Sequence, residues 1–393
     1  MTSEGAMTIS ERRKYLTKMQ TRYQAADRRL RGQLLTEMEA ITGMHRKSLT
    51  RLMAQQSLTR RRRRTQRGTV YGPAVRQIVR IVWGSLDCIC AERLTPQLLA
   101  TAHHLASFGE IALTPLLVEQ LGAISESTVT RMLRGMPRAL PRLPRQGPTQ
   151  ANRVLRDVPM GRIPWQTTEP GWCEVDLVHH CGESAAGEFL HTLQLIDIAT
   201  GWSERAAVLG RGQAAMEAGF RRLLARLPFP LVHLHPDNGS EFFNDHLVRF
   251  FGEEVTGLTL SRSRPYQKND NRFVEQKNDS LVRAYLGNQR LDTAAQCDAL
   301  NALYVEMGVY YNLFQPVLHL IEKAVIAGKL KRTWDDARTP YQRLVATDAL
   351  TPTLAQGLAA LYTATNPRHL RQQMYDALAH LWERPTITAL AAG

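Results

Sequence analysis

The stretch Trp172-Cys-Glu-Val-Asp-Leu-Val178 decides the fold of this chain. Apolar residues alternate there with Glu and Asp, which is typical of a strand in an α/β sheet. A second apolar run, Leu231-Val-His-Leu-His235, leads into Pro-Asp-Asn-Gly239 and predicts a strand that ends at a tight turn. Each of the two strands carries an aspartate toward its end. The sequence therefore predicts a sheet that brings carboxylates together at one edge.

A regular alternation of elements surrounds these two runs. Strands are predicted at 171–180, 188–197, 202–209, 231–235 and 258–261, and helices at 213–227, near 246–251 and from about 270 to 285. Three strands, helix, strand, helix, strand and helix is the ribonuclease-H-like order. We expect this core to occupy residues 169–315.

Three acidic residues stand at matching places in that order. Asp176 and Asp237 belong to the two strands, and Glu275 belongs to the last helix. A cage of carboxylates suits hard cations that take oxygen ligands, above all Mg²⁺, with Mn²⁺ as a substitute. Two such ions about 4 Å apart would hold the attacking and leaving oxygens of a phosphodiester exchange. The alternative is that all three are ordinary exposed carboxylates.

Other acidic residues compete for the same role. Glu241 and Asp270 lie nearby in the sequence but fit the order of the three carboxylates less well. Asp197 ends a predicted strand, and we interpret it as a structural or DNA-proximal residue instead of a metal ligand.

The charge of the chain favours a polyanionic partner. The net charge is +14 and the pI about 9.9. Residues 1–165 hold 28 Lys and Arg against 11 Asp and Glu, a balance of +17, whereas the remaining residues hold 22 against 25, a balance of −3. This asymmetry predicts a basic N-terminal part that binds double-stranded DNA and a separate part that carries the chemistry.

The sequence also indicates a cellular compartment. Five cysteines without disulfide-like spacing indicate a reducing environment. No window approaches about 18 consecutive apolar residues, so we expect no membrane span. The N-terminus has no apolar signal core. These features predict a cytoplasmic protein.

The N-terminal part has the outline of a helix-turn-helix. Residues 8–58 show helical periodicity that breaks at Gly43, and a basic amphipathic helix follows over 45–53. The residues expected in or beside a major groove are Arg46, Lys47, Ser48 and Arg51. The alternative is an ordinary helical hairpin with a solvated basic face. The basic linker 59–68 closes this first domain, 1–68, and five of its arginines could neutralise phosphates or form a solvated tract: Arg60, Arg61, Arg62, Arg63 and Arg64.

A second helix-turn-helix unit is predicted over 69–140. Thr95-Pro96 and Thr114-Pro115 each have the pattern of an N-cap followed by proline at the first helical position. Ser125 is expected to cap the next helix, whose candidate DNA contacts are Ser127, Thr128, Thr130, Arg131 and Arg134. Residues 141–168 are rich in Pro and Arg and predict a linker. Residues 316–393 are expected to be helical, with Asn366-Pro367 starting the last helix.

Together the three carboxylate motifs resemble those of the DDE transposases and integrases of bacterial insertion sequences, which share a retroviral-integrase-like catalytic core. Asp176 lies in Trp-Cys-Glu-Val-Asp-Leu, Asp237 in His-Pro-Asp-Asn-Gly-Ser-Glu-Phe, and Glu275 in Asn-Arg-Phe-Val-Glu-Gln-Lys-Asn, 38 positions further on. The family's usual gap is about 35 residues. The resemblance covers roughly 165–315. The chain lacks the retroviral His-His-Cys-Cys module and, by prediction, a C-terminal barrel.

The resemblance implies a transposase that cuts element ends and joins the freed 3′-hydroxyls to target DNA with two divalent ions. Asp176 would bridge both ions. It further implies a homo-oligomer on DNA, in the nucleoid of a bacterium.

Residues around Glu275 have predicted roles beside DNA. Lys268, Arg272 and Lys277 are close enough in sequence to hold phosphates. Asn278 is three positions beyond Glu275, on the same helix face, and is expected to line the site or contact DNA.

Two further hypotheses remain open. The chain is alternatively a DNA-binding regulator derived from a transposase that no longer cuts, or a ribonuclease-H-like nuclease that does not transfer strands.

Overall fold

The computed structural model describes residues 7–55, 58, 70–137, 168–236, 245–261, 272–326 and 329–387. The chain forms two compact units, Met1–Thr69 and Val70–Gly393. Several residues of the sequence analysis lie outside the described part: Asp237, Lys268 and Arg60 to Arg64, together with the side chain of Arg272.

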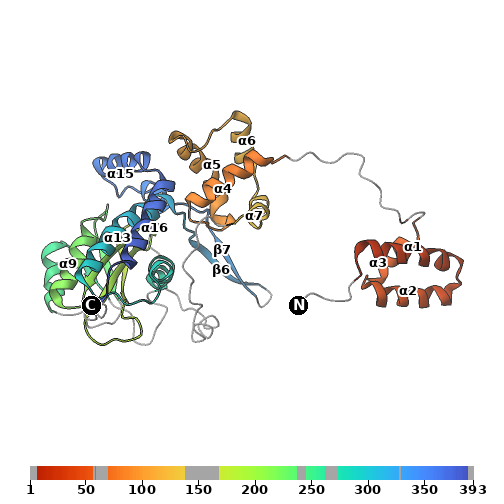
Figure 1. Ribbon diagram of the computed structural model, residues 1–393, viewed down its shortest axis with the longest axis horizontal. Helices are drawn as coiled ribbons and strands as arrows, with labels where there is room; N and C mark the ends of the chain where they lie inside the picture. The colour runs from red at the N-terminus through yellow and green to blue at the C-terminus, as the bar shows by residue number, and fades with distance from the viewer. Residues whose placement is uncertain are drawn as a thin grey trace. The chain divides into compact units, whose positions relative to one another are not determined.

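The described part of the first unit contains three helices, α1 (Ile9–Ala25), α2 (Arg28–Thr42) and α3 (Arg46–Met53) (Figure 1). The predicted break at Gly43 is confirmed, because this residue ends α2 in the left-handed region with φ 66°. Each helix contributes apolar residues to one small core, which contains Leu16, Met19, Leu34, Leu35, Met38, Leu49 and Met53. The unit is thus held together by a helical core of its own.

A five-stranded mixed sheet forms the centre of the second unit. Its strands are β1 (Trp172–His179), β2 (Leu190–Asp197), β3 (Ser203–Leu209), β4 (His233–Pro236) and β5 (Thr259–Leu260), in the order β3-β2-β1-β4-β5. The first three strands pair antiparallel, and β4 and β5 are parallel to β1. The predicted succession of strands and helices is confirmed over this segment. The arrangement is compatible with a ribonuclease-H-like core.

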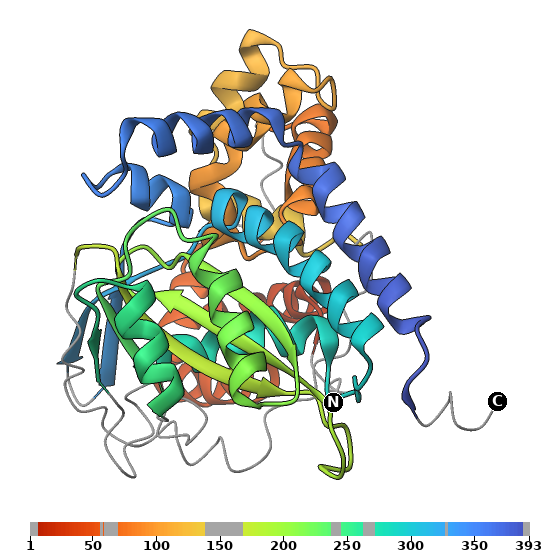
Figure 2. The ribbon, with the colours of Figure 1, turned by 90° about the vertical axis from the view of Figure 1, so that its left-hand side faces the viewer.

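Helices cover both faces of the sheet (Figure 2). α9 (Gln213–Leu224) and α10 (Asp245–Glu254) pack with Val175, Leu193 and Leu195 in one core cluster, whereas α13 (Ala294–Phe314) packs with Val178 and Ala207 in another. Alternate residues of each strand therefore face different cores. α9 approaches the sheet closely at Gly219, where a Cβ atom would lie 2.4 Å from Leu193 Cδ1.

The predicted Glu275 helix is not a uniform α-helix. It consists of α11 (Arg272–Lys277), a π-helical segment η1 (Asn278–Arg283) and α12 (Ala284–Leu286). Hydrophobic spacing does not reveal such a change, since a π turn adds only one residue to a helical turn. π segments occur frequently at functional sites, and Asn278, the first residue of this one, is therefore a candidate functional residue.

Among the described residues of the second unit, four helices precede the sheet: α4 (Pro73–Ser85), α5 (Ala91–Ser107), α6 (Pro115–Ala123) and α7 (Glu126–Leu133). The helix start at Thr114-Pro115 is confirmed, because Thr114 accepts a hydrogen bond from the Leu117 amide. The start at Thr95-Pro96 is wrong. Pro96 lies inside α5, and the Thr95 hydroxyl donates to the Ala91 carbonyl one turn earlier.

These helices are joined to the sheet region by buried polar contacts. Tyr310 on α13 donates to the Ser85 carbonyl over 2.7 Å, and Gln315 donates to the Leu86 carbonyl over 2.9 Å. Asp87, in the turn after α4, accepts from Arg371 Nη2 over 2.7 Å. Residues 70–137 are therefore part of the same compact unit as the sheet.

The C-terminal region is not entirely helical, so the prediction for 316–393 is wrong in part. β6 (Leu320–Ile326) and β7 (Lys329–Trp334) form an antiparallel hairpin before α14 (Pro340–Val345), α15 (Pro352–Ala364) and α16 (Pro367–Trp382). Alternation in Lys-Leu-Lys-Arg-Thr-Trp334 is a strand signal that the sequence analysis missed. The start of α16 is confirmed, with Asn366 as its N-cap.

No helix in the described part of the chain is long and apolar enough to cross a membrane.

Candidate nucleic-acid-processing site

Asp176 lies on β1 directly opposite the start of the π-helical segment. The Asn278 side-chain amide donates to Asp176 Oδ2 over 2.6 Å, and the Leu177 amide donates to Oδ1 over 2.8 Å. Asp176 is half-buried, so one side of its carboxylate is held by the protein while the residue retains contact with solvent. Asn278 thus fixes the orientation of this carboxylate.

Glu174 makes a second contact between the same strand and the same helix. It lies two residues before Asp176, hence on the same face of β1. Its Oε2 atom accepts hydrogen bonds from the Phe273 and Val274 amides, each over 2.9 Å. The first amides of a helix lack partners within the helix and carry partial positive charge. A fully buried carboxylate therefore caps the start of α11.

These two contacts hold the helix segment that carries Glu275 against the strand that carries Asp176. Residues two apart on a strand are separated by about 6.6 Å, and five residues of helix advance by about 7.5 Å, so both contacts form when helix and strand run side by side. Glu275 lies between the two contacts along the helix. Its side chain is exposed, whereas Val274 is buried. The structure thus brings together the elements that carry two of the three predicted carboxylates.

The third carboxylate, Asp237, lies outside the described residues. β4, the strand that precedes it, is parallel to β1, and its last residue Pro236 pairs with Val175. Among the described residues, no group of three or more His, Cys, Asp and Glu side chains is arranged to hold a metal ion. The donor chemistry of Asp176 and Glu275 nevertheless fits Mg²⁺ or Mn²⁺, since both are carboxylates and both are open to solvent.

A buried polar row extends from Asp176 across the sheet. Gln194 on β2 pairs with Asp176, and Arg205 on β3 pairs with Gln194. Arg205 is fully buried, with its guanidinium 5.5 Å from the centre of the Tyr311 ring. Burial lowers the pKa of Arg205. Its Nε and Nη1 atoms have no hydrogen-bond partner among the described residues. The sheet surface next to Asp176 is therefore lined by polar side chains.

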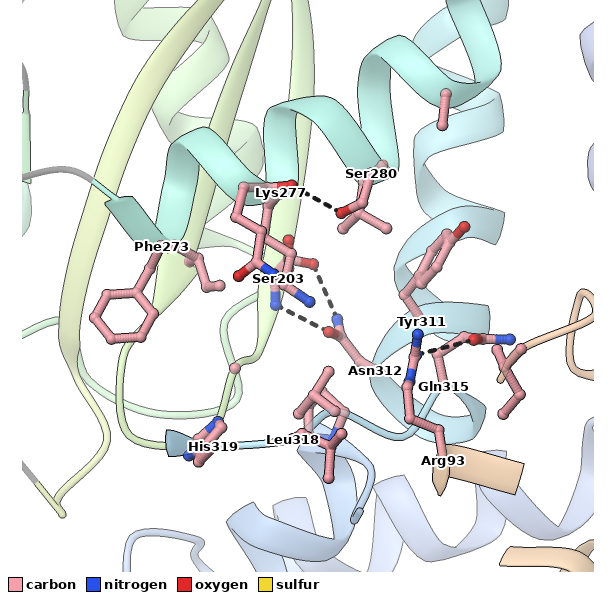
Figure 3. A pocket seen from close by; sticks show the side chains of 18 of the residues that line it. Arg93, Ser203, Phe273, Lys277, Ser280, Tyr311, Asn312, Gln315, Leu318 and His319 are labelled. Carbon is pink, nitrogen blue, oxygen red and sulfur yellow. Dashed lines mark hydrogen bonds between the residues drawn. The ribbon is translucent and has the colours of Figure 1, made fainter. Parts of the chain in front are cut away.

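Lys277 lies on α11 but faces a different way from Glu275. Its half-buried side chain lines a cavity of about 650 Å³ (Figure 3). Its role as a DNA phosphate contact stays a prediction, as do those of Arg272 and Lys268, of which the structure describes no side chain.

The predicted DNA-contacting residues of α3 differ in their surroundings. Lys47, Ser48 and Arg51 are exposed. Arg46 instead donates to the Thr36 hydroxyl and to the Gly32 carbonyl, each over 2.9 Å, and so ties α3 to α2. The exposed face of α3 remains basic, and DNA binding there stays a prediction.

The candidates on α7 form a small network of their own. Arg131 donates to the Ser127 carbonyl and to the Thr128 hydroxyl. Ser125 occupies the N-cap position as expected, but its hydroxyl contacts the side chains of Ser127 and Thr128 instead of a backbone amide. Three of the five candidates are exposed, namely Ser127, Arg131 and Arg134. The other two, Thr128 and Thr130, are half-buried.

Comparison with known proteins gives one extensive match. The chain is 34% identical over 323 residues to "Uncharacterized protein y4rM" of Sinorhizobium fredii (strain NBRC 101917 / NGR234), a match that covers 82% of this chain and 91% of that protein. The chain belongs to the y4rM family. Because the y4rM match covers so much of the chain, it extends well beyond the segment with the sheet and Glu275. No protein-family model matches.

Among solved structures, the chain is similar to the catalytic core domain of BIV integrase. The identity is 17% and the TM-score 0.29, and the match covers 45% of this chain and 94% of that one.

Sequence reasoning missed Glu174 as a member of this site. The residue stands in the same motif as Asp176, and the two-residue period of a strand places both on one face. Its partner could not be found in this way, since the amides of Phe273 and Val274 lie about a hundred positions further along the chain.

Proposed function

We propose that this chain is a DNA transposase that cleaves the ends of an insertion element and transfers their 3′-hydroxyls to target DNA, with Asp176, Asp237 and Glu275 as catalytic carboxylates. The observation that supports it most is the double attachment of the Glu275 helix to the Asp176 strand, through Glu174 and Asn278. A surface glutamate with no function would not require a buried carboxylate and an amide to fix its helix at that place.

The three carboxylates would hold two divalent cations, Mg²⁺ or Mn²⁺. Such ions, when bound, supply activation of water and neutralisation of charge in phosphodiester exchange. The chain's own part is to hold the carboxylates in place. Asn278 orients Asp176 through its amide, and Glu174 holds the start of α11 through two backbone amides. This pre-organisation reduces the movement required when the ions and DNA bind.

DNA would be held chiefly by the N-terminal unit and the basic linker. The exposed Lys47 and Arg51 lie on the outer face of α3, and the arginines at 60–64 follow α3 in the sequence. Contacts of this type neutralise phosphates and make the affinity fall as salt rises. Because two DNA ends must be joined, we propose that at least two copies of the chain act together on DNA.

The experiment is a joining assay with a labelled duplex from the end of the encoding element, a target plasmid and Mg²⁺. The wild type is expected to join the duplex to the plasmid, whereas Asp176→Asn and Glu275→Gln are expected to bind the duplex without joining it. Glu253→Gln, at an exposed position of α10, removes a carboxylate elsewhere and serves as the matched control.

The outcome separates this proposal from the other two. Binding without cleavage or joining by the wild type would favour a regulator that no longer cuts. Cleavage without joined products would favour a nuclease. Joining by Glu275→Gln at the wild-type rate would overturn the role of this carboxylate.

A further inference from the structure

The Lys277 cavity is distinct from the carboxylate site, although both involve the same helix. It lies between α11 and η1 on one side and the ends of β2, β3 and α13 on the others, and the β6–β7 hairpin also contributes to its wall (Figure 3). Its volume of about 650 Å³ falls within the range of about 300–1,000 Å³ that is typical of small-molecule sites.

The amine of Lys277 forms no ion pair with the acidic residues that the structure describes in this cavity. Lys277 makes no hydrogen bond or ion pair with the described residues. The guanidinium groups of Arg93 and Arg205 lie near enough to add to the positive charge around it. Arg93 also lines the cavity, and its guanidinium donates to the Pro316 carbonyl and to the Gln315 side chain.

Two of the three acidic groups of the cavity wall, Asp87 and Asp197, are held by other donors. Asp87 accepts from Arg371 and from the Tyr285 hydroxyl. Asp197 accepts from the Gly171 amide, and from the amide and hydroxyl of Thr200. Glu92 is exposed. An anion inside the cavity would therefore find the Lys277 amine open to pairing, whereas Asp87 and Asp197 already have donors.

The rest of the wall suits a flat apolar body. Phe273, Tyr311 and Trp334 contribute aromatic rings, and Ile196, Leu281 and Leu318 contribute aliphatic surface. Trp334 is 49% exposed, which is high for a large apolar side chain. The Ser203 backbone amide donates to Asn312 Oδ1, and Asn312 Nδ2 donates to the Ser203 carbonyl. These polar atoms of the cavity wall therefore already have partners.

We propose that this cavity binds a mononucleotide, with the phosphate at Lys277 and the base against the aromatic wall. A nucleotide combines the two properties that the cavity offers to a ligand, a compact anion and a planar ring. The proposal does not depend on the carboxylate site, because none of its contacts involves Asp176 or Glu275. The nucleotide could be free or could be the terminal nucleotide of a DNA strand.

The test is a calorimetric titration of the full chain with thymidine monophosphate, thymidine and inorganic phosphate. Thymidine monophosphate is expected to bind at least tenfold more tightly than either fragment. Lys277→Met is expected to weaken that binding by about tenfold or more, the loss typical of a charge-assisted hydrogen bond. Lys331→Met, which removes an exposed cation of β7 outside the cavity, is expected to leave it unchanged.

A second measurement uses the wild type, so that it does not depend on the folding of a variant. A bound ligand shields a lysine amine from acylating reagents, so acetylation reports occupancy of the cavity. Thymidine monophosphate should protect Lys277 from acetylation, as judged by peptide mass spectrometry, and should not protect the exposed Lys47.

Several results would overturn the proposal. These are equal affinity of the wild type and Lys277→Met, absence of binding by thymidine monophosphate, and binding of inorganic phosphate as tight as that of the nucleotide. Competition by a short single strand with a 5′-phosphate would support the site and would indicate a strand terminus as the source of the nucleotide. If thymidine monophosphate binds and such a strand does not compete with it, the site is supported and a free nucleotide is indicated as its ligand.

Discussion

The Asn278 amide donates to the Asp176 carboxylate over 2.6 Å, from the first residue of a π-helical segment to the middle of the central strand. A primary amide can donate to this carboxylate at any pH at which the protein is folded. It therefore orients Asp176 without neutralising it, which leaves the negative charge for another partner.

Asn278→Ala should reduce strand joining by about 10- to 100-fold, because Asp176 loses the donor that orients it. The rate of joining at saturating DNA measures this effect, with a filter-binding assay to show that DNA affinity is retained. Asp279→Asn, an exposed neighbour on the same segment, is the control and should behave as the wild type. Unchanged joining by Asn278→Ala would show that the contact has no catalytic role.

Substitution of Glu174 should separate its charge from its hydrogen bonds. Glu174→Gln keeps an oxygen that can accept from the Phe273 and Val274 amides, whereas Glu174→Ala leaves the partly buried Phe273 amide and the buried Val274 amide without this acceptor. The alanine variant should lose about 2–4 kcal/mol of unfolding free energy and the glutamine variant clearly less. Urea denaturation followed by circular dichroism measures both. Equal losses would mean that the acceptor geometry is unimportant.

Arg371 and Asp87 form a buried ion pair between α16 and the turn after α4, with side chains that are 8% and 6% exposed. Arg371→Met should destabilise the second unit by about 3–5 kcal/mol, since it leaves a buried carboxylate without its cation. Arg368→Met removes a half-exposed arginine that pairs with Glu110 and should cost less than about 1 kcal/mol. Thermal unfolding of the two variants provides the comparison.

Removal of residues 1–69 should leave a folded protein that binds DNA weakly. The helices of the first unit have their own core, and residues 70–393 form a compact unit by themselves. We expect an unchanged unfolding temperature for 70–393, a lower affinity for duplex DNA, and a shallower dependence of that affinity on salt. An unchanged salt dependence would place the main phosphate contacts in the second unit.

His180 should contribute to acid sensitivity. Burial lowers the pKa of His180 to about 3, well below its usual value near 6.5, so the unfolded chain binds a proton that the folded chain does not. The contribution of neutral His180 to the free energy of unfolding is complete above about pH 6.5. This contribution should be lost as the pH drops from there toward 3. In His180→Gln, urea midpoints between pH 7.5 and 5 should fall less steeply. His103→Gln, at an exposed position of α5, should keep the wild-type slope.

The strands and the Glu275 helix were predictable because their signals are local. Alternation in 172–178 and the apolar run before Pro236 reflect how each segment meets a core, whatever its partners. Thr114-Pro115 and Asn366-Pro367 were predictable for the same reason, since an N-cap acts within one turn.

The remaining features depend on distant partners. Pro96 has the local pattern of a helix start, yet packing of Leu94 and Leu98 in the core extends α5 on both sides of it. The capping of α11 by Glu174 and the cavity at Lys277 arise only when the helix is placed on the sheet. Three carboxylates can be proposed from sequence, whereas their mutual positions cannot.

The π-helical segment Asn278–Arg283 also determines which way the side chains after it point, relative to those before it. Each residue of an α-helix turns the chain by about 100°, so one additional residue in a turn rotates everything after it relative to everything before it. Asn278 can thus contact Asp176 while Tyr285 contacts Asp87. A single-residue deletion at Asp279 would bring these two demands into conflict, although it removes no side chain from either contact. The two contacts therefore depend on the number of residues in this helix as well as on which residues it contains.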